Sequence, residues 1–312
     1  MWIRIIQRLL SIQFVVFILK HSKRISFPGF EKIPIYDVAR FFWQAITKGS
    51  LSMRASAVSF SFFLALFPTI IFLFTLIPYI PIENFQEQLM GLLKSFMPYD
   101  AYQATEETIL DIVTNQRGGL LSIGFLSAMY FSTNGFDALI TAFNNTYHDF
   151  ETRSGFQQRM VSILLVIIAT LLLMAAIVLV IFCEYALNRI FHEDKVSYYL
   201  IHGGQWIALF GLFYSLISFT FYLGPSRKSG WKFASAGSVL ATILSIVMSV
   251  GFAYYVNNFG AYNKLYGSIG TLIVVLLWIY FNSLVVLAGF DLNASIREAK
   301  KNKEASLKHS SG

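Results

Sequence analysis

The stretch MVSILLVIIATLLLMAAIVLVIFC, residues 160–183, contains no Asp, Glu, Lys or Arg. A helix that crosses the hydrocarbon core of a bilayer needs about 20 consecutive apolar residues, and this stretch is long enough. Five further windows without these charged residues lie on either side of it: 55–82, 118–136, 203–226, 233–263 and 265–290. The pattern predicts an integral membrane protein with several spans.

Composition supports the same conclusion. Of the 312 residues, 56% are hydrophobic and 13% are charged, whereas about 25% of the residues in a soluble domain are charged. A soluble helical core with six such windows would have too little polar surface to cover them. We therefore expect an all-α polytopic protein with six transmembrane helices, at about 57–80, 119–143, 160–183, 203–224, 233–256 and 266–290.

The distribution of basic residues predicts the orientation. With six spans both termini lie on one side, and the segments assigned to that side hold 19 of the 24 Lys and Arg residues. The other side holds Lys94, Arg117, Arg189, Lys195 and Lys264. Both termini are therefore expected to be cytoplasmic. The net charge of +7 reflects topology and attraction to anionic headgroups, so no nucleic-acid partner is expected.

Three segments are expected to lie outside the 55–290 membrane domain or between its spans. Residues 1–54 read as cytoplasmic amphipathic or interfacial helices, serving either as an anchor or as a lipid-sensing element. The external loop 81–118 contains two helical patterns, FQEQLMGLLKSF and TEETILDIV, and forms either a surface cap or a substrate lid. Residues 291–312, rich in Lys and Ser, are expected to be a solvated cytoplasmic tail.

The second predicted span carries polar residues at helical spacing. They are Asn134, Asp137, Thr141, Asn145 and His148, with Asn144 beside them. A charged group in hydrocarbon is costly, so such residues face a bundle interior or a water-filled cavity. The alternative is that the span ends near Asp137 and the later residues lie in the headgroup zone. Both interpretations predict that this face does not contact lipid tails.

Two other sets of residues are candidates for packing or binding. Small residues recur every four positions in the fifth predicted span, which permits close helix approach for plain packing, a gating seam or a dimer: Gly237, Ala241, Ser245, Ser249 and Ala253. Basic residues near the cytoplasmic ends of the spans could attract an anionic substrate: Arg153, Arg159, Arg227 and Lys228.

The sequence offers no motif of a familiar enzyme class. Cys183 is the single cysteine, and the five histidines are scattered without metal-ligand spacing. We find no phosphate-binding loop, dinucleotide fingerprint or nucleophile elbow. We therefore expect no metal, no cofactor and no enzymatic activity.

Three separated segments resemble one bacterial family. They are ASAVSFSFFLALFPTIIF, FNNTYHDFETRSGFQQRM and AYNKLYGSIGTLIVVLLWIYFNSLVVLAGFDLNASI, and together they resemble the YihY/virulence factor BrkB family over about residues 35–298. The matching positions are Ala57, Phe60, Pro68, Asn144, Tyr147, Glu151, Arg153, Tyr266, Gly267, Trp278, Tyr280, Gly289, Asp291 and Asn293. Asp291 stands where the family often has Glu, which keeps the acid.

The resemblance implies six spans, cytoplasmic termini and a place in the bacterial plasma membrane. It also implies links to virulence and to envelope or solute transport, and a ribonuclease BN label that arose by mistaken assignment. Hydrolysis of RNA would need a metal cluster or a His and acid constellation, which this sequence lacks.

Two hypotheses about function follow. In the first, which we favour, a transporter or lipid translocase moves an anionic lipid or small solute, with Asp137 as a proton or cation site in a cavity bounded by the first and sixth spans. In the second, a membrane scaffold binds lipids or partner proteins and the polar residues only hold helices together. The sequence does not settle the substrate or whether the chain forms a homo-oligomer.

Overall fold

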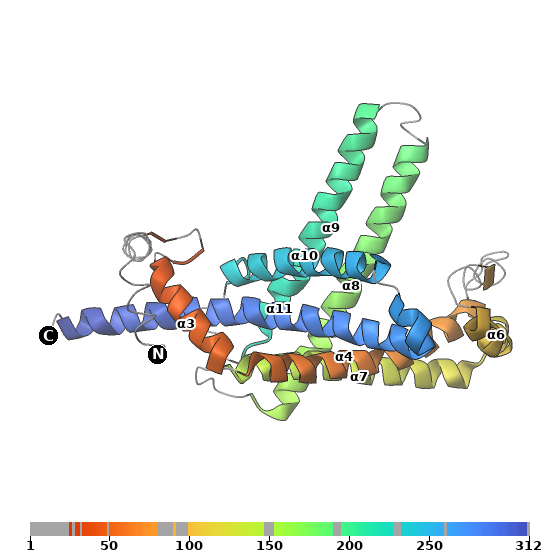
Figure 1. Ribbon diagram of the computed structural model, residues 1–312, viewed down its shortest axis with the longest axis horizontal. Helices are drawn as coiled ribbons and strands as arrows, with labels where there is room; N and C mark the ends of the chain where they lie inside the picture. Colours follow the sequence, from red (N-terminus) through yellow and green to blue (C-terminus); the bar gives the residue numbers. More distant parts are fainter. Residues whose placement is uncertain are drawn as a thin grey trace.

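The structure is a computed structural model that describes residues 25–26, 29–31, 33–48, 50–79, 90–91, 99–146, 153–189, 195–226, 232–258 and 261–310. The elements assigned there are helices, as expected for an all-α protein (Figure 1). They are α3 (Ile35–Lys48), α4 (Leu51–Leu76), the 3-10 turn η1 (Ile77–Tyr79), α6 (Tyr99–Thr114), α7 (Gly118–Asn144), α8 (Gly155–Arg189), α9 (Lys195–Leu223), α10 (Ala236–Asn258) and α11 (Ala261–Ser310).

Five of these helices are long and apolar enough to cross a membrane, which confirms the polytopic fold class. They are α4, α8, α9, α10 and α11. The helix α7 has 27 residues and is therefore long enough to span, but it is not among the five helices with a sufficiently apolar segment. The sixth span consequently stays a prediction.

The helices are arranged around an antiparallel pair, α4 and α7 (Figure 1). The helix α11 packs on α4, and α10 packs along α11. The helices α8 and α9 form a hairpin that projects obliquely from this layer (Figure 1). The hairpin exposes many large apolar side chains, most of them on α8, which suits contact with lipid.

Several helix boundaries differ from the sequence-based expectation; α9, for example, begins at Lys195 rather than near residue 203. The helix α4 begins at Leu51 rather than near residue 57, so Arg54 belongs to its first turns. The helix α11 continues past residue 290 to Ser310, so much of the expected solvated tail is helical. The pattern TEETILDIV is confirmed as a helix by α6. Most of FQEQLMGLLKSF and all of residues 1–24 lie outside the described residues.

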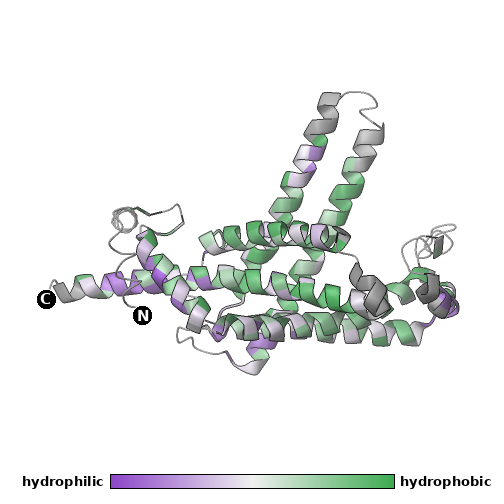
Figure 2. Cartoon of the chain, in the orientation of Figure 1, coloured by the Kyte–Doolittle hydropathy of each residue, from purple (hydrophilic) through white to green (hydrophobic). Residues whose placement is uncertain are grey.

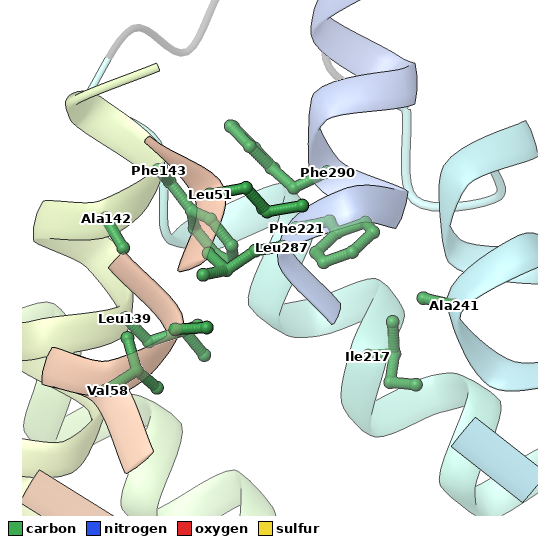
Figure 3. Close-up of a cluster of buried hydrophobic side chains, with 11 residues drawn as sticks. Leu51, Val58, Leu139, Ala142, Phe143, Ile217, Phe221, Ala241, Leu287 and Phe290 are labelled. Carbon is green, nitrogen blue, oxygen red and sulfur yellow. The ribbon is translucent and has the colours of Figure 1, made fainter. Parts of the chain in front are cut away.

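The main apolar core lies near the end of the bundle where α3 packs on α11 (Figure 1). Three aromatic rings from α7, α9 and α11 form its centre (Figure 3). Phe143 stacks on Phe290 with 4.1 Å between ring centroids, and Phe221 meets both rings edge-on at 5.6 and 5.7 Å. Since each aromatic side chain buries a large apolar area, this cluster fixes the relative positions of three helices.

The helices α10 and α11 approach most closely at two glycines. A Cβ atom added to Gly289 would lie 2.7 Å from the Cβ of Ala241 and 2.7 Å from the carbonyl oxygen of Gly237. A Cβ atom at Gly237 would lie 2.6 Å from Asn293. These distances are shorter than any van der Waals contact, so glycine is required for the backbones to meet here. Farther along the two helices, an open apolar groove is lined by Phe252 and Val256 of α10 and Trp278 of α11.

Replacing Gly289 by Ala should destabilise the protein. The new methyl group meets backbone that cannot move aside, and overpacking of this kind costs about 1–3 kcal/mol. Thermal unfolding in detergent would measure the loss. Gly251→Ala in α10 is the matched control, because its Cβ meets nothing within 4 Å. Equal melting temperatures for the two variants would contradict the close approach.

A second, smaller core joins α3 to the extension of α11. Val38 of α3 is buried with Leu292, Ile296 and Ala299, which recur along one face of α11. Next to this core, Glu31 accepts hydrogen bonds from Lys300 at 2.6 Å and Lys232 at 2.9 Å. Figure 2 shows hydrophilic residues gathered at this end of the bundle. The apolar face of α3 that contains Val38 therefore packs against α11.

The contacts of Glu31 should make this end of the protein sensitive to acid. The hydrogen bond from Lys300, followed by that from Lys232, lowers the pKa of Glu31 below its ordinary value of 4.5. A lowered carboxyl pKa stabilises the folded state above pH about 4.5, and this contribution is lost as the pH falls through the folded-state pKa.

We expect Glu31→Gln to melt at a lower temperature than the wild type at neutral pH. The difference should shrink once the pH falls below about 4.5, the ordinary pKa of the Glu31 carboxyl. Thermal unfolding of both proteins across a pH series tests this, and a difference that does not change with pH would contradict it.

Candidate functional site

A buried ion pair ties three helices together at the end of the bundle where α3 packs on α11. The guanidinium of Arg54, on α4, donates to both carboxylate oxygens of Asp291, on α11, at 2.6 and 3.2 Å. The side chains are 7% and 0% exposed. Arg54 also donates to the backbone carbonyl oxygen of Ala142, on α7, at 3.0 Å. Removing two charges from water is costly, so this arrangement persists only because the geometry satisfies both groups.

Neighbouring hydroxyl groups complete the surroundings of the pair. Thr146, just after α7, lies 3.4 Å from a carboxylate oxygen of Asp291 and 3.5 Å from the guanidinium of Arg54. The hydroxyl of Ser295 donates to the backbone carbonyl of Asp291 at 2.6 Å. The stacked rings of Phe143 and Phe290 lie beside this polar group in sequence and space. The ion pair and the aromatic cluster therefore hold the same helices.

Two asparagines bind the chain between α9 and α10: one contacts the turn that follows α9, and the other contacts the start of α10. The side-chain oxygen of Asn144 accepts a hydrogen bond from the backbone N–H of Ser226 at 3.1 Å. The side-chain oxygen of Asn293 accepts from the backbone N–H of Gly237 at 2.8 Å, and its nitrogen donates to Ser235 at 2.8 Å. Asn293 thus binds the first turn of α10, whose backbone N–H groups lack partners within the helix. Both asparagines have structural contacts here.

Arg153 has a contact that the sequence does not reveal. Its guanidinium donates to the backbone carbonyl oxygens of Leu223, Gly224 and Pro225, at 2.6 to 3.1 Å. These carbonyls lie at the end of α9, where the helix dipole is negative and favours a cation. Partial burial lowers the pKa of the Arg153 guanidinium. Arg153 therefore caps a helix, which differs from the expected role of attracting an anion.

The polar stripe of α7 faces α8. Gln158 donates through its side-chain nitrogen to Asp137 at 2.9 Å and to Thr141 at 3.0 Å. Arg159 donates to the side-chain oxygen of Asn134 at 2.5 Å. The structure thus brings three of the expected stripe residues together with the start of α8. These hydrogen-bond partners lie in the first turns of α8, just before the third predicted span, and not on the first or sixth span.

The remaining stripe residues behave differently. Asn145 is exposed just beyond the end of α7, while Asn144 is buried and points to Ser226, away from the stripe. Five further residues of the predicted site and family motif lie outside the described residues: His148, Tyr147, Glu151, Arg227 and Lys228.

Several family-motif positions make packing contacts. The hydroxyl of Tyr280 lies 2.8 Å from that of Ser52, and the indole N–H of Trp278 donates to Ser249 at 3.3 Å. Ala57 and Phe60 are exposed on α4, which continues through Pro68. Tyr266 and Gly267 lie in a part of α11 of which only the backbone is described.

The small residues of α10 change environment along the helix. Gly237, Ala241 and Ser245 are buried, Ser249 is half-buried, and Ala253 is exposed beside the apolar groove. The stripe therefore supports close helix approach at Gly237 and Ala241, where α10 meets Gly289.

Two important residues are absent from the sequence-based list of site residues, Arg54 and Gln158. Both lie at the edge of an apolar window, where a polar residue is normally read as an anchor in the headgroup zone. Their positions in the sequence are the features that could have identified them. Arg54 is the only charged residue in α4, and Gln158 lies in the first turn of α8, after a polar connection.

Breaking the Arg54–Asp291 pair should destabilise the protein strongly. Arg54→Met leaves a buried carboxylate without its cation, and such changes cost about 3–5 kcal/mol. Chemical unfolding should show a smaller loss for the double variant Arg54→Met/Asp291→Met than the sum of the two single losses. The matched control is Arg117→Gln, since Arg117 pairs with Asp111 at the same 2.6 Å but is half exposed. Comparable losses in Arg54→Met and Arg117→Gln would contradict the importance of burial.

Comparisons with known proteins place this architecture in a family. The chain matches the family described as Virulence factor BrkB over residues 42–311. It is 30% identical over 253 residues to the ribonuclease-like protein YfkH of Bacillus subtilis, covering 80% of this chain and 90% of the relative. It is 23% identical to a UPF0761 membrane protein of Aggregatibacter aphrophilus (85% of this chain, 94% of the relative) and to one of Haemophilus influenzae (85% and 97%).

No solved structure is similar to this chain. The matched residues 42–311 include the five helices of the described residues that could cross a membrane, and both residues of the buried ion pair. The chain is therefore an integral membrane protein of the Virulence factor BrkB family.

Proposed function

We propose that this protein is a transporter or translocase that moves an anionic lipid or a small anionic solute across a bacterial plasma membrane. The observation that carries the proposal is the half-exposed polar cluster between α7 and α8. Asp137 and Arg159 lie there on helices of membrane-spanning length. Ionisable residues at membrane depth are rare and usually mark a substrate or ion pathway.

The residues of the cluster have distinct proposed roles. Asp137 holds and releases a proton or a cation, and Gln158 orients its carboxylate through the 2.9 Å hydrogen bond. Arg159 attracts the anionic group of the substrate, and Asn134 orients the guanidinium. The proposal includes no chemical conversion of the substrate and no metal or cofactor.

The buried ion pair has a separate role in this proposal. Arg54 and Asp291 keep α4, α7 and α11 together at one end of the bundle, while an open apolar groove lies between α10 and α11 farther along. A protein that moves a substrate needs one end closed while the other is accessible. The excess of Lys and Arg near both termini supports a cytoplasmic location for the closed end.

A membrane scaffold is the second candidate function. It is favoured by the fact that Asn134, Asp137 and Thr141 each have a hydrogen-bond partner on α8. Hydrogen bonds of this kind also serve as simple contacts between helices. In a scaffold, these residues would contribute to stability and the protein would move nothing.

Measurements on proteoliposomes separate the two candidates. We expect wild-type protein to move a labelled anionic lipid or solute under an imposed proton gradient. Asp137→Asn should reduce the rate about tenfold or more, because a side chain positioned to transfer a proton usually changes a rate by at least that factor. Asp37→Asn on α3 is the matched control, because this carboxylate lies outside the cluster. Folded wild-type protein that moves none of a broad lipid and solute panel would favour the scaffold.

A further inference from the structure

Arg159 is a cation within a membrane helix that has no carboxylate partner in the described part of the chain. It lies in the first turns of the span that begins at Gly155. The four ion pairs among the described residues involve Arg54, Arg117, Lys232 and Lys300. Asp137 is nearby in the cluster, but its carboxylate accepts a hydrogen bond from Gln158. The positive charge of Arg159 is therefore not neutralised by these groups.

The surroundings of the guanidinium fix its orientation and leave donors available. One terminal nitrogen donates to Asn134 at 2.5 Å, and the other donates weakly to the backbone carbonyl of Tyr130 at 3.4 Å. The guanidinium carbon lies 4.9 Å from the centre of the Tyr130 ring, a cation–π arrangement. An Arg side chain has five N–H donors, so these contacts hold it in place without using all of them.

Arg153 provides an instructive contrast within the same connection between helices. It also lacks a carboxylate partner among the described residues, but three backbone carbonyl oxygens accept its N–H groups. Arg159 has no comparable set of carbonyl acceptors. It donates to one backbone carbonyl, that of Tyr130, at the long distance of 3.4 Å. A fixed fork of donors with an unneutralised charge suits a phosphate group, which accepts two parallel hydrogen bonds.

The position of Arg159 selects a lipid phosphate rather than a soluble anion. On α8, exposed apolar side chains begin one turn before Arg159 and continue along the helix: Phe156, Met160, Leu164, Ile167 and Leu171. Residues three or four apart share a helix face, so this stripe runs beside Arg159 into the membrane. The site therefore combines a cation near the start of a membrane helix with an apolar surface for an acyl chain.

We infer that Arg159, oriented by Asn134 and Tyr130, binds the phosphate of an anionic phospholipid whose acyl chain lies along the exposed stripe of α8. The inference builds on the proposed function, since it names the class of substrate that the α7–α8 cluster receives. The lipid phosphate supplies a partner for the guanidinium of Arg159, which pairs with no carboxylate of the described residues.

The test measures lipid binding to the full-length protein in a neutral detergent. Native mass spectrometry would record retention of phosphatidylglycerol, of diacylglycerol and of glycerol 3-phosphate. The second probe lacks the phosphate and the third lacks the acyl chains. We expect wild type to retain phosphatidylglycerol alone, and Arg159→Gln to weaken retention about tenfold or more, because a hydrogen bond to a charged group contributes about 1.5–3 kcal/mol.

Two further variants control for unfolding and for general attraction to the surface. Tyr130→Leu keeps every charge but removes the ring beneath the guanidinium, so it should weaken retention less than Arg159→Gln. Arg40→Gln removes an exposed cation on α3 and should change nothing. The inference is overturned if Arg159→Gln retains the lipid as well as wild type, if Arg40→Gln weakens retention equally, or if glycerol 3-phosphate competes as well as the lipid.

This binding experiment can fail independently of the transport experiment. Retention that depends on Arg159, together with a transport rate that does not depend on Asp137, would keep the lipid site and remove the proposed function. Transport that depends on Asp137, with retention that does not depend on Arg159, would keep the proposed function and remove the lipid site.

Discussion

The Arg54–Asp291 ion pair is the contact on which the rest of the structure depends. It joins the first turns of α4 to α11 and reaches the backbone of α7, and the aromatic cluster of Phe143, Phe221 and Phe290 packs next to it. A buried pair gives a directional constraint that apolar side chains alone do not. Lipid tails are as apolar as Leu, so the hydrophobic effect does little to choose one helix arrangement over another inside a bilayer.

Side-chain contacts are unevenly distributed along the membrane helices. Buried polar contacts gather where α4, α7, α9, α10 and α11 meet, through Asn144, Asn293 and the ion pair. By contrast, only 6% of the most apolar window of α8 is buried. The polar cluster with Asp137 and Arg159 lies at the boundary between these two regions. A site at such a boundary has a rigid support on one side and lipid on the other.

Sequence patterns predict the helices of this protein better than they predict its contacts. Charge-free windows locate the apolar parts of the membrane helices, because membrane insertion depends on local composition. They do not locate the helix ends: α9 begins at Lys195, before its window, and α11 continues to Ser310, beyond its window. The stripe of α7 is visible from periodicity, but its partners Gln158 and Arg159 depend on which helix crosses it. Arg54 reads as an anchor until α4 is known to begin at Leu51. The tail looks solvated from its Lys content, although Leu292, Ile296 and Ala299 already have helical spacing.

The continuous helix α11 has a mechanical consequence. Its 50 residues extend over about 75 Å at 1.5 Å per residue, more than twice the hydrocarbon thickness of about 30 Å. One stretch carries Trp278 in the membrane, Asp291 at the ion pair and Lys300 beside Glu31. Because a helix transmits rotation and translation along its axis, α11 works as a lever. A force applied to its last turns on the water side is felt at the ion pair and between the membrane helices.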